Sequence, residues 1–471
     1  MATQHGKHKY RALRGDDESF EDDIEKRLPV HSWWALERHR ICKMIGIFAV
    51  FSIFTVLAWG VAVPYRNGTV YRRQPLRFTS DGTFQISVFA DLHFGENAWN
   101  TWGPQQDINS LRIIGDILDA EKQDLVVLNG DLITGENTYL FNSSDYLDIL
   151  VKPIVDRGLP FASTYGNHDS SFNLSREQIL GRERRYHESW TNQMVFTPTS
   201  GVSNYYLEVF PSSGGPTPCL ILWFFDSRGG HLYQQKSPNN TLIGQPNWVD
   251  QTVVDWFLTT NTQLVAKHNN KPIPSLAFVH IPTNASAALQ TELGVDPHRH
   301  PGINDDCPLA PQAQGWCANG TEGCPYGGQD EPFMQAITST PGLIALFSGH
   351  DHGDTWCYNW DGLVPGMNVK GEGTKLCFGQ HSGYGGYGSW ERGAREILVR
   401  EEDLQREEGW RECGVETWIR LEGGGVVGRV ELNATFGEDV YPATERTNSS
   451  CPTCDYTIVS PMPGTEKEEG K

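Results

Sequence analysis

The chain has 471 residues, with 38 basic against 58 acidic side chains, so its formal net charge is -20. This acidity argues against a nucleic-acid-binding surface, and no nucleic-acid partner is expected. The length is sufficient for a large domain with additional segments. The 49 glycines and 15 tryptophans are typical of a loop-rich enzyme and unusual for a helical bundle.

The N-terminal segment predicts a membrane anchor. Residues 1–43 are polar and charged, which predicts a disordered cytosolic tail. Residues 44–63 are apolar and uncharged, and a helix of this length, ~30 Å, crosses a bilayer. The run begins too far from the N-terminus for an ordinary signal peptide, so we predict a transmembrane signal anchor followed by a stem at 64–79. The alternative is a buried core helix.

Sequons and cysteines predict the compartment. Eight Asn-x-Ser/Thr sequons follow the apolar segment and predict a glycoprotein: Asn67, Asn142, Asn173, Asn239, Asn284, Asn319, Asn433 and Asn448. Nine of the ten cysteines also follow it, and most are expected in disulfides, with Cys357 and Cys377 able to close a local loop. The prediction is a single-pass type II membrane protein of the secretory pathway (ER, Golgi, vacuole or cell surface), its globular domain lumenal or extracellular.

The globular domain is expected at 80–435. Apolar runs predict strands at 84–89, 125–128, 160–164, 205–210, 220–225, 275–279, 343–347 and 425–432. Helical spacing predicts helices at 107–121 and 146–155, so the first five elements alternate strand and helix. That order indicates an α/β domain with parallel crossovers. Residues 281–340 and 361–424 are expected to form long loops or insertions, and 436–471 an extended tail.

Polar side chains follow five of the predicted strands. They are Asp91 and His93, then Asp131, then Asn167 with His168 and Asp169, then His280, and finally His350 with His352. Divalent Zn, Mn and Fe accept imidazole and carboxylate ligands together. Taken singly, each residue has another explanation, as a turn former or a hydrogen-bonded histidine, and for His93 alone that explanation is favoured. Taken together and in this order, they predict a site for two metal ions, Fe, Mn or Zn.

The predicted ligands divide between the two ions. Asp131 is expected to bridge them, Asp91, His93 and His352 to complete one, and Asn167, His280 and His350 to complete the other. His168 is expected to protonate a leaving alkoxide or to stabilise phosphate charge. Asp169 is expected to orient His168.

These motifs resemble the calcineurin-like metallophosphoesterase superfamily. The resemblance rests on Asp91-Leu92-His93, Gly130-Asp131, Gly166-Asn167-His168-Asp169, His280 and Gly349-His350-Asp351-His352. It implies a four-layer α/β/β/α sandwich of two mixed sheets, the ligand roles given above, and His168 as the catalytic histidine. Phe225-Asp226-Ser227 and the Gly/Tyr-rich run at 383–388 resemble the short class of plant purple-acid-phosphatase-like proteins and their fungal membrane-anchored relatives.

The sequence departs from that pattern at Thr134. The superfamily's usual Gly-Asp-x-x-Asp lacks its outer Asp here, and typical purple acid phosphatases have a tyrosine at this position and no histidine where His93 stands. No tyrosinate-to-iron colour is therefore expected. His381, within the Gly-rich segment 371–393, is a candidate phosphate contact beside Asn167 and His168; the alternative is a structural loop.

The predicted function is hydrolysis of a phosphomonoester, on a protein or a small molecule, by a hydroxide bound to the metal pair. One alternative is a phosphodiesterase with the same site. The other is a catalytically silent, metal-binding membrane glycoprotein.

Overall fold

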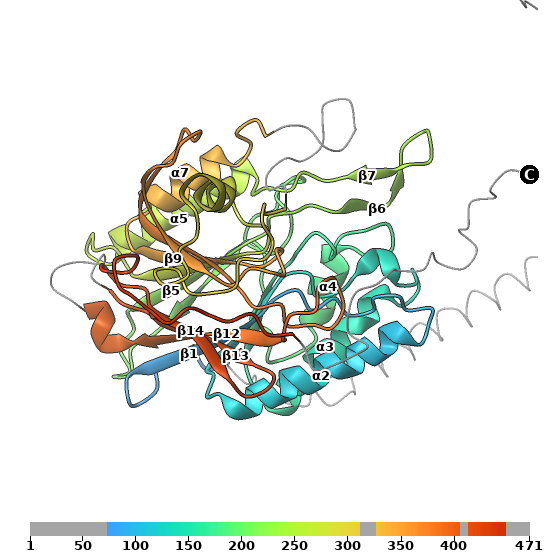
Figure 1. Cartoon of the computed structure of the whole chain (residues 1–471), viewed down its shortest axis with the longest axis horizontal. Helices are drawn as coiled ribbons and strands as arrows, with labels where there is room; N and C mark the ends of the chain where they lie inside the picture. The colour runs from blue at the N-terminus through green and yellow to red at the C-terminus, as the bar shows by residue number, and fades with distance from the viewer. Residues whose placement is uncertain (1–72, 311–325, 406–412, 449–471) are drawn as a thin grey trace, which may run out of the picture. The chain divides into compact units, whose positions relative to one another are not determined.

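The computed structural model describes residues 73–310, 326–405 and 413–448, and the part from Gln74 onward forms one compact unit (Figure 1). Two six-stranded sheets form its centre. The first has the order β14 (Val426–Glu431), β13 (Glu416–Leu421), β12 (Gly393–Arg400), β1 (Thr83–Phe89), β2 (Leu125–Asn129) and β3 (Phe161–Thr164). The second has the order β10 (Cys357–Leu363), β11 (Lys370–Phe378), β9 (Leu343–Ser348), β8 (Ser275–Val279), β5 (Leu220–Phe225) and β4 (Tyr205–Val209).

Both sheets are mixed, as predicted. β1, β2 and β3 are parallel, as are β5, β8, β9 and β11, while the outer strands pair antiparallel. The period of two places alternate residues of a strand on opposite faces. In β2, Leu125 and Val127 therefore face the core between the sheets, whereas Val126 and Leu128 join the cluster on the outer face.

Helices cover the outer face of each sheet. α2 (Trp102–Ala120), α3 (Tyr146–Asp156) and α4 (Arg176–Glu183) supply the cluster on the first sheet. α5 (Gln251–Lys267) and α7 (Glu331–Ser339) supply the cluster on the second. The α/β architecture predicted from the sequence is confirmed.

Several short elements lie at the ends of the sheets. They are η1 (Gly135–Asn137), η2 (Ser143–Asp145), α6 (Asn284–Ala288), η3 (Leu289–Leu293), η4 (Glu401–Gln405) and the hairpin of β6 (His231–Lys236) and β7 (Leu242–Gly244). Figure 1 shows this hairpin extending away from the two main sheets.

The prediction of long loops at 281–340 and 361–424 was wrong. The first segment contains α6 and α7, and the second contains β11, β12 and the whole of β13. β12 pairs antiparallel with β1 in the middle of the first sheet. Its central residues Arg395 and Glu396 are ionisable and buried; Arg395 donates a hydrogen bond to Phe378 O (2.6 Å), and Glu396 accepts one from Ser87 Oγ (2.7 Å). Strand prediction depends on a run of apolar residues, and these two polar side chains interrupt it.

The folded unit extends beyond both predicted boundaries. Leu76 and Phe78, placed in the stem by the sequence, are buried between the sheets. Phe436, placed in the tail, is buried in the same core, and Tyr441 donates its backbone N–H to His298 O at 2.7 Å. The disulfide Cys357–Cys377, suggested by the sequence, joins paired positions of β10 and β11.

Other predictions fall outside the described residues. These are the tail 1–43, the span 44–63 and the sequons Asn67 and Asn319. Among the helices that the structure does describe, none combines the length and the apolar character that a bilayer crossing requires.

Candidate metal centre

The predicted ligands follow the carboxyl ends of strands that run in parallel. Asp91 and His93 come after β1, Asp131 after β2 and Asn167 after β3; His280 follows β8, and the pair His350 and His352 follows β9. Parallel strands end at the same edge of a sheet, and here the two edges meet. Three groups of side chains result, each with ligand atoms within 4.8 Å of one another: Asp91, His93 and His352; His93, Asp131 and His168; Asp131, His280 and His350.

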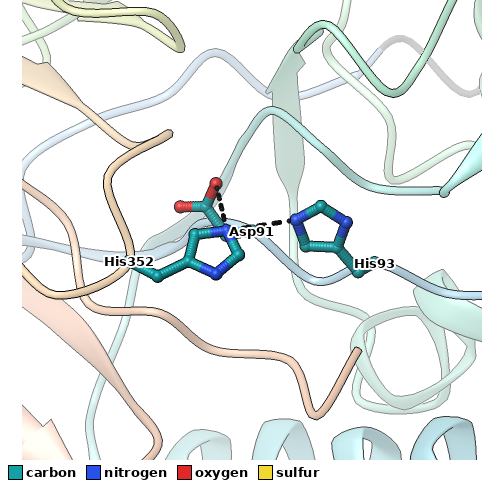
Figure 2. Close-up of side chains that lie close together, drawn as sticks. All are labelled: Asp91, His93 and His352. Atoms are coloured by element: carbon teal, nitrogen blue, oxygen red, sulfur yellow. Dashed lines mark hydrogen bonds and ion pairs between the residues drawn. The ribbon is translucent and has the colours of Figure 1, made fainter. Parts of the chain in front are cut away.

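The first group brings together the two histidines expected on one metal (Figure 2). Nε2 of His93 lies 3.2 Å from Nε2 of His352. Nε2 of His352 lies 3.5 Å from Oδ1 of Asp91. All three side chains are buried, and their free ligand atoms point toward one another as the donors around an ion would.

Asp131 connects this group to the second. Its Oδ2 lies 3.8 Å from Nε2 of His93 and 2.9 Å from Nε2 of His280. One carboxylate oxygen thus faces ligands of both predicted metals, which is the position of a bridge.

Two buried ligand atoms have no hydrogen-bond partner among the described residues. They are Oδ1 of Asn167 and Nε2 of His280. Nε2 of His280 lies 2.9 Å from Oδ2 of Asp131, but the two atoms do not have the geometry of a hydrogen bond. Buried polar atoms are normally satisfied, so an unpaired oxygen and an unpaired ring nitrogen beside a buried carboxylate fit a metal ion. The donor set of imidazoles, carboxylates and one amide oxygen suits two borderline divalent ions.

Hydrogen bonds on the far side of three rings fix which nitrogen faces the centre. Nδ1 of His280 lies 2.9 Å from Asn129 O, and Nδ1 of His352 lies 2.9 Å from Tyr387 O. A carbonyl only accepts, so each Nδ1 carries the proton and each Nε2 keeps its lone pair for a ligand. Tyr387 also stacks its ring on His352, with centroids 4.0 Å apart.

The third ring is that of His93, which contacts Thr134. Thr134 is the position at which the sequence departs from the superfamily's usual Gly-Asp-x-x-Asp. Nδ1 of His93 lies 2.9 Å from Oγ1 of Thr134, which donates to Oε2 of Glu96 at 2.7 Å. Asn137 donates to the other oxygen of Glu96. The hydroxyl of Thr134 therefore fixes the ring of His93, which is one of the predicted ligands. Sequence reasoning missed Glu96, because no motif contains it.

The backbone at the centre is unusual. Four site residues have a left-handed conformation: Asp91 (φ 56°), His93 (φ 48°), Asp131 (φ 48°) and His350 (φ 79°). Non-glycine residues rarely adopt it, and a cluster of such residues is typical of functional sites. The turns also require close approach, because a Cβ on Gly166 would lie 2.2 Å from Oδ1 of Asp131.

At Asp131 and His350 the pKa is shifted toward the form that binds a metal, whereas at His280 burial lowers the pKa but Asp131 outweighs burial and raises it to about 9. Burial raises the pKa of Asp131, but the imidazoles around it, His280 first, outweigh burial and hold the pKa well below its usual value. Burial lowers the pKa of His350 to about 4, with nearby His280 acting in the same direction. An ionised carboxylate and a neutral imidazole are the forms that bind metals.

His168 lies at the edge of the centre and remains partly exposed (35%). Its backbone N–H donates to Oδ1 of Asp131 at 2.8 Å, and its Nε2 lies 4.0 Å from Oδ2 of the same residue. Its Nδ1 contacts Oε1 of Glu136, in η1. Burial lowers the pKa of His168, but Glu136 and then Asp131 outweigh it and hold the pKa well above its ordinary value.

Asp169 has a different position from the one predicted. Its carboxylate accepts three backbone N–H groups, those of Leu132 and Ile133 (both 3.0 Å) and of Gly166 (2.8 Å). The residue that contacts the His168 ring is Glu136. Asp169 thus joins the loop after β2 to the loop after β3, and the orienting position belongs to a residue that the sequence reasoning missed.

His381 lies behind the centre. Its ring stacks on His352 with centroids 3.9 Å apart, and its Nε2 lies 3.0 Å from Gly385 O. The side chain is 1% exposed. The structure therefore places it against a ligand ring, with no open face toward a phosphate.

The chain matches known proteins over this region. A family model described as calcineurin-like phosphoesterase matches residues 84–354. A relative from Arabidopsis thaliana, named "Probable inactive purple acid phosphatase 29", is 27% identical over 80% of this chain and 91% of its own length. "Phosphatase DCR2" of Saccharomyces cerevisiae is 26% identical over 74% of this chain and 56% of its own. The crystal structure of a dimetal phosphatase from Danio rerio is 14% identical, with a TM-score of 0.41, and covers 74% of this chain and 99% of its own.

Proposed function

Because the chain belongs to the calcineurin-like phosphoesterase family, and is therefore a hydrolase of phosphoester bonds that uses two metal ions, we propose that its reaction is phosphomonoester hydrolysis. The observation that carries the proposal is the convergence at one point of Asp91, His93, Asp131, His280 and His352, with His168 beside them. We assign the first metal to Asp91, His93 and His352, the second to Asn167, His280 and His350, and the bridge to Asp131.

The bound metals supply the activation of a water and the neutralisation of phosphate charge. The chain's own residues do the rest. Asp131 and Asn167 would hold the ions, and a phosphate bound to them would lie within reach of His168. Nε2 of His168 gives its proton to the departing ester oxygen, and the carboxylate of Glu136 at Nδ1 stabilises the protonated ring before transfer. Asp169 holds the loop that carries Asn167 and His168.

The phosphate group of a monoester carries one more negative charge than that of a diester. The protonated imidazole of His168, at the edge of the centre, suits this additional charge. The test is turnover of p-nitrophenyl phosphate and of bis(p-nitrophenyl) phosphate by the purified domain loaded with Zn, Mn or Fe. Higher kcat/KM for the monoester supports the proposal. Preference for the bis ester would replace it with the phosphodiesterase alternative.

A second candidate is a catalytically silent metal-binding glycoprotein, because relatives from Arabidopsis thaliana carry "probable inactive" in their names. The complete ligand set and the Glu136–His168 contact favour activity. Bound metal without turnover of either ester would favour the silent alternative.

We propose the metal pair to be colourless in the visible range, since Thr134 occupies the position at which purple acid phosphatases have tyrosine and bonds His93 instead. The absorption spectrum of the iron-loaded protein tests this. A charge-transfer band from tyrosinate would contradict it.

We also propose a lumenal or extracellular domain carried by a type II anchor at 44–63. The described sequons support the compartment, because Asn142, Asn173, Asn239, Asn284, Asn433 and Asn448 are all exposed or half-buried. The Cys357–Cys377 disulfide agrees with an oxidising compartment. Loss of mass on deglycosylation, and retention in the detergent phase until 44–63 is deleted, are expected. A soluble, unglycosylated full chain would refute both.

A further inference from the structure

A cavity of about 630 Å³ lies beside the loop that carries Asn167 and His168. Its walls come from the start of α4, from residues 193–202 and from the β6–β7 hairpin, which extends from the sheets in Figure 1. Ligand pockets commonly measure ~300–1,000 Å³. Ser170, which follows His168 by two residues, lines the cavity and accepts a hydrogen bond from Gln245 at 2.6 Å. The cavity therefore adjoins the proposed catalytic loop.

Two buried arginines, Arg176 and Arg228, line this cavity, 3% and 4% exposed. Arg176 holds the backbone by donating to Gly166 O at 2.7 Å. Arg228 donates through Nη1 to Thr199 O (3.1 Å) and to Asp250 (3.2 Å). Its Nη2 has no hydrogen-bond partner within the described part of the chain. A buried guanidinium N–H without an acceptor is unfavourable, so a ligand oxygen that reached Nη2 through a small movement of the side chain would gain a hydrogen bond there.

The remaining wall is mostly neutral, and Glu177 is the acidic residue that lines it. Gln193, Gln235 and Gln245 line it, and an amide side chain both donates and accepts, as a peptide group does. Phe196 lines it too and is 74% exposed, which leaves its ring open to an apolar side chain. Because Asp250 pairs with Arg228, this arginine does not by itself select a strongly acidic ligand.

We propose that this cavity binds the extended polypeptide next to the phosphorylated residue of a protein substrate. This inference rests on the proposed function, since the phosphoryl group occupies the metal centre. The substrate chain then passes Ser170 and enters the cavity. A substrate carbonyl accepts from Nη2 of Arg228, the glutamine amides pair with neighbouring peptide groups, and one apolar substrate side chain packs on Phe196.

The test compares short phosphoserine peptides with p-nitrophenyl phosphate on the full-length protein. In Phe196→Ala, the ratio of kcat/KM for the peptides to kcat/KM for the small ester is expected to fall about tenfold, equivalent to one lost apolar contact. Gln235→Leu is expected to lower the same ratio. Leu363→Ala, an exposed apolar residue on β10 (62%), is the matched control and should leave the ratio unchanged. An unchanged ratio in both cavity variants would overturn the inference.

Direct binding keeps the inference separate from the proposed reaction. A fluorescently labelled unphosphorylated peptide of the best substrate is expected to bind the wild-type protein and to bind Phe196→Ala more weakly, whether or not turnover occurs. Competition by a free oligosaccharide, with none by the peptide, would assign the cavity to carbohydrate and overturn the inference. Absence of turnover with intact peptide binding would refute the proposed reaction alone.

Discussion

Nδ1 of His93 lies 2.9 Å from Oγ1 of Thr134, at the position where the sequence departs from the superfamily's usual Gly-Asp-x-x-Asp. The hydroxyl of Thr134 donates a hydrogen bond to Glu96, so a buried carboxylate, a hydroxyl and the ring of His93 form one chain of hydrogen bonds. The departure is thus a support for the metal centre.

Thr134→Val is expected to weaken metal binding. It keeps the volume but leaves Nδ1 of His93 and Oε2 of Glu96 without their partner, and loss of such a support costs ~10–100-fold in metal affinity or activity. Metal titration of the stripped protein measures the effect. Thr134→Ser keeps the hydroxyl and is the control. Equal affinity in Thr134→Val and the wild type would show that the hydrogen bond does not orient the ligand.

His168→Ala is expected to lower kcat by ~10²–10⁴ while metal content remains near that of the wild type, because the ring lies beside the ligands and is not assigned to either ion. The loss should be larger for an alkyl phosphate than for p-nitrophenyl phosphate, since p-nitrophenolate leaves without a proton. Elemental analysis and steady-state kinetics check both parts. Equal losses on the two esters would refute proton donation by His168.

Glu136→Gln is expected to reduce kcat less than His168→Ala, since the amide still contacts Nδ1 but lacks the charge that stabilises the protonated ring. Asp169→Asn is the comparison. It disturbs three backbone hydrogen bonds, so it should lower thermal stability, whereas Glu136→Gln should not. If Glu136→Gln matched the wild type in kcat, Glu136 would have no positioning role.

Removal of metal is expected to lower the unfolding temperature and to abolish turnover. Without cations, the ionised carboxylates of Asp91 and Asp131 and the converging rings stay buried with no ion between them. A ligand that binds only the native state stabilises it by mass action. Calorimetry of chelated and reloaded protein measures this shift. An unchanged unfolding temperature would contradict metal binding at this centre.

Glu396, far from the metals on β12, predicts a pH dependence of stability. Burial raises its pKa to about 8. A carboxyl whose folded-state pKa is raised stabilises the fold while protonated, and that contribution falls as pH rises from the unfolded value toward 8. The free energy of unfolding of the wild type should therefore fall relative to Glu396→Gln, by at most about 1.4 kcal/mol per pH unit. Denaturant unfolding at pH 5 to 8 tests it. A pH-independent difference would contradict the raised pKa.

The sequence predicted the elements whose signal is local. The apolar strands β1, β2, β5, β8 and β9 were found because each is a continuous buried run, and the polar residues after β1, β2, β3, β8 and β9 identified the centre. Strand β12 was missed, because its buried Arg395 and Glu396 are satisfied only by partners distant in sequence.

The supports of the centre were missed for the same reason. Glu136 and Glu96 belong to no motif, and their contacts with His168 and Thr134 exist only once the loops after β1, β2 and β3 meet. The order of residue types along the chain is enough to predict the metal ligands. The residues that orient those ligands can be identified only in the folded structure. Asp169 shows the converse: its place in a motif suggested a catalytic role, and its hydrogen bonds serve the backbone.

The left-handed backbone at Asp91, His93, Asp131 and His350 has an evolutionary consequence. Each position would be relaxed by glycine, at the loss of a ligand. In a descendant that is no longer selected for turnover, substitution of these residues by glycine would increase folding stability. Such substitutions would therefore be expected to accumulate early. Glycine at these four positions in a homologue would therefore indicate that the homologue has lost its catalytic activity.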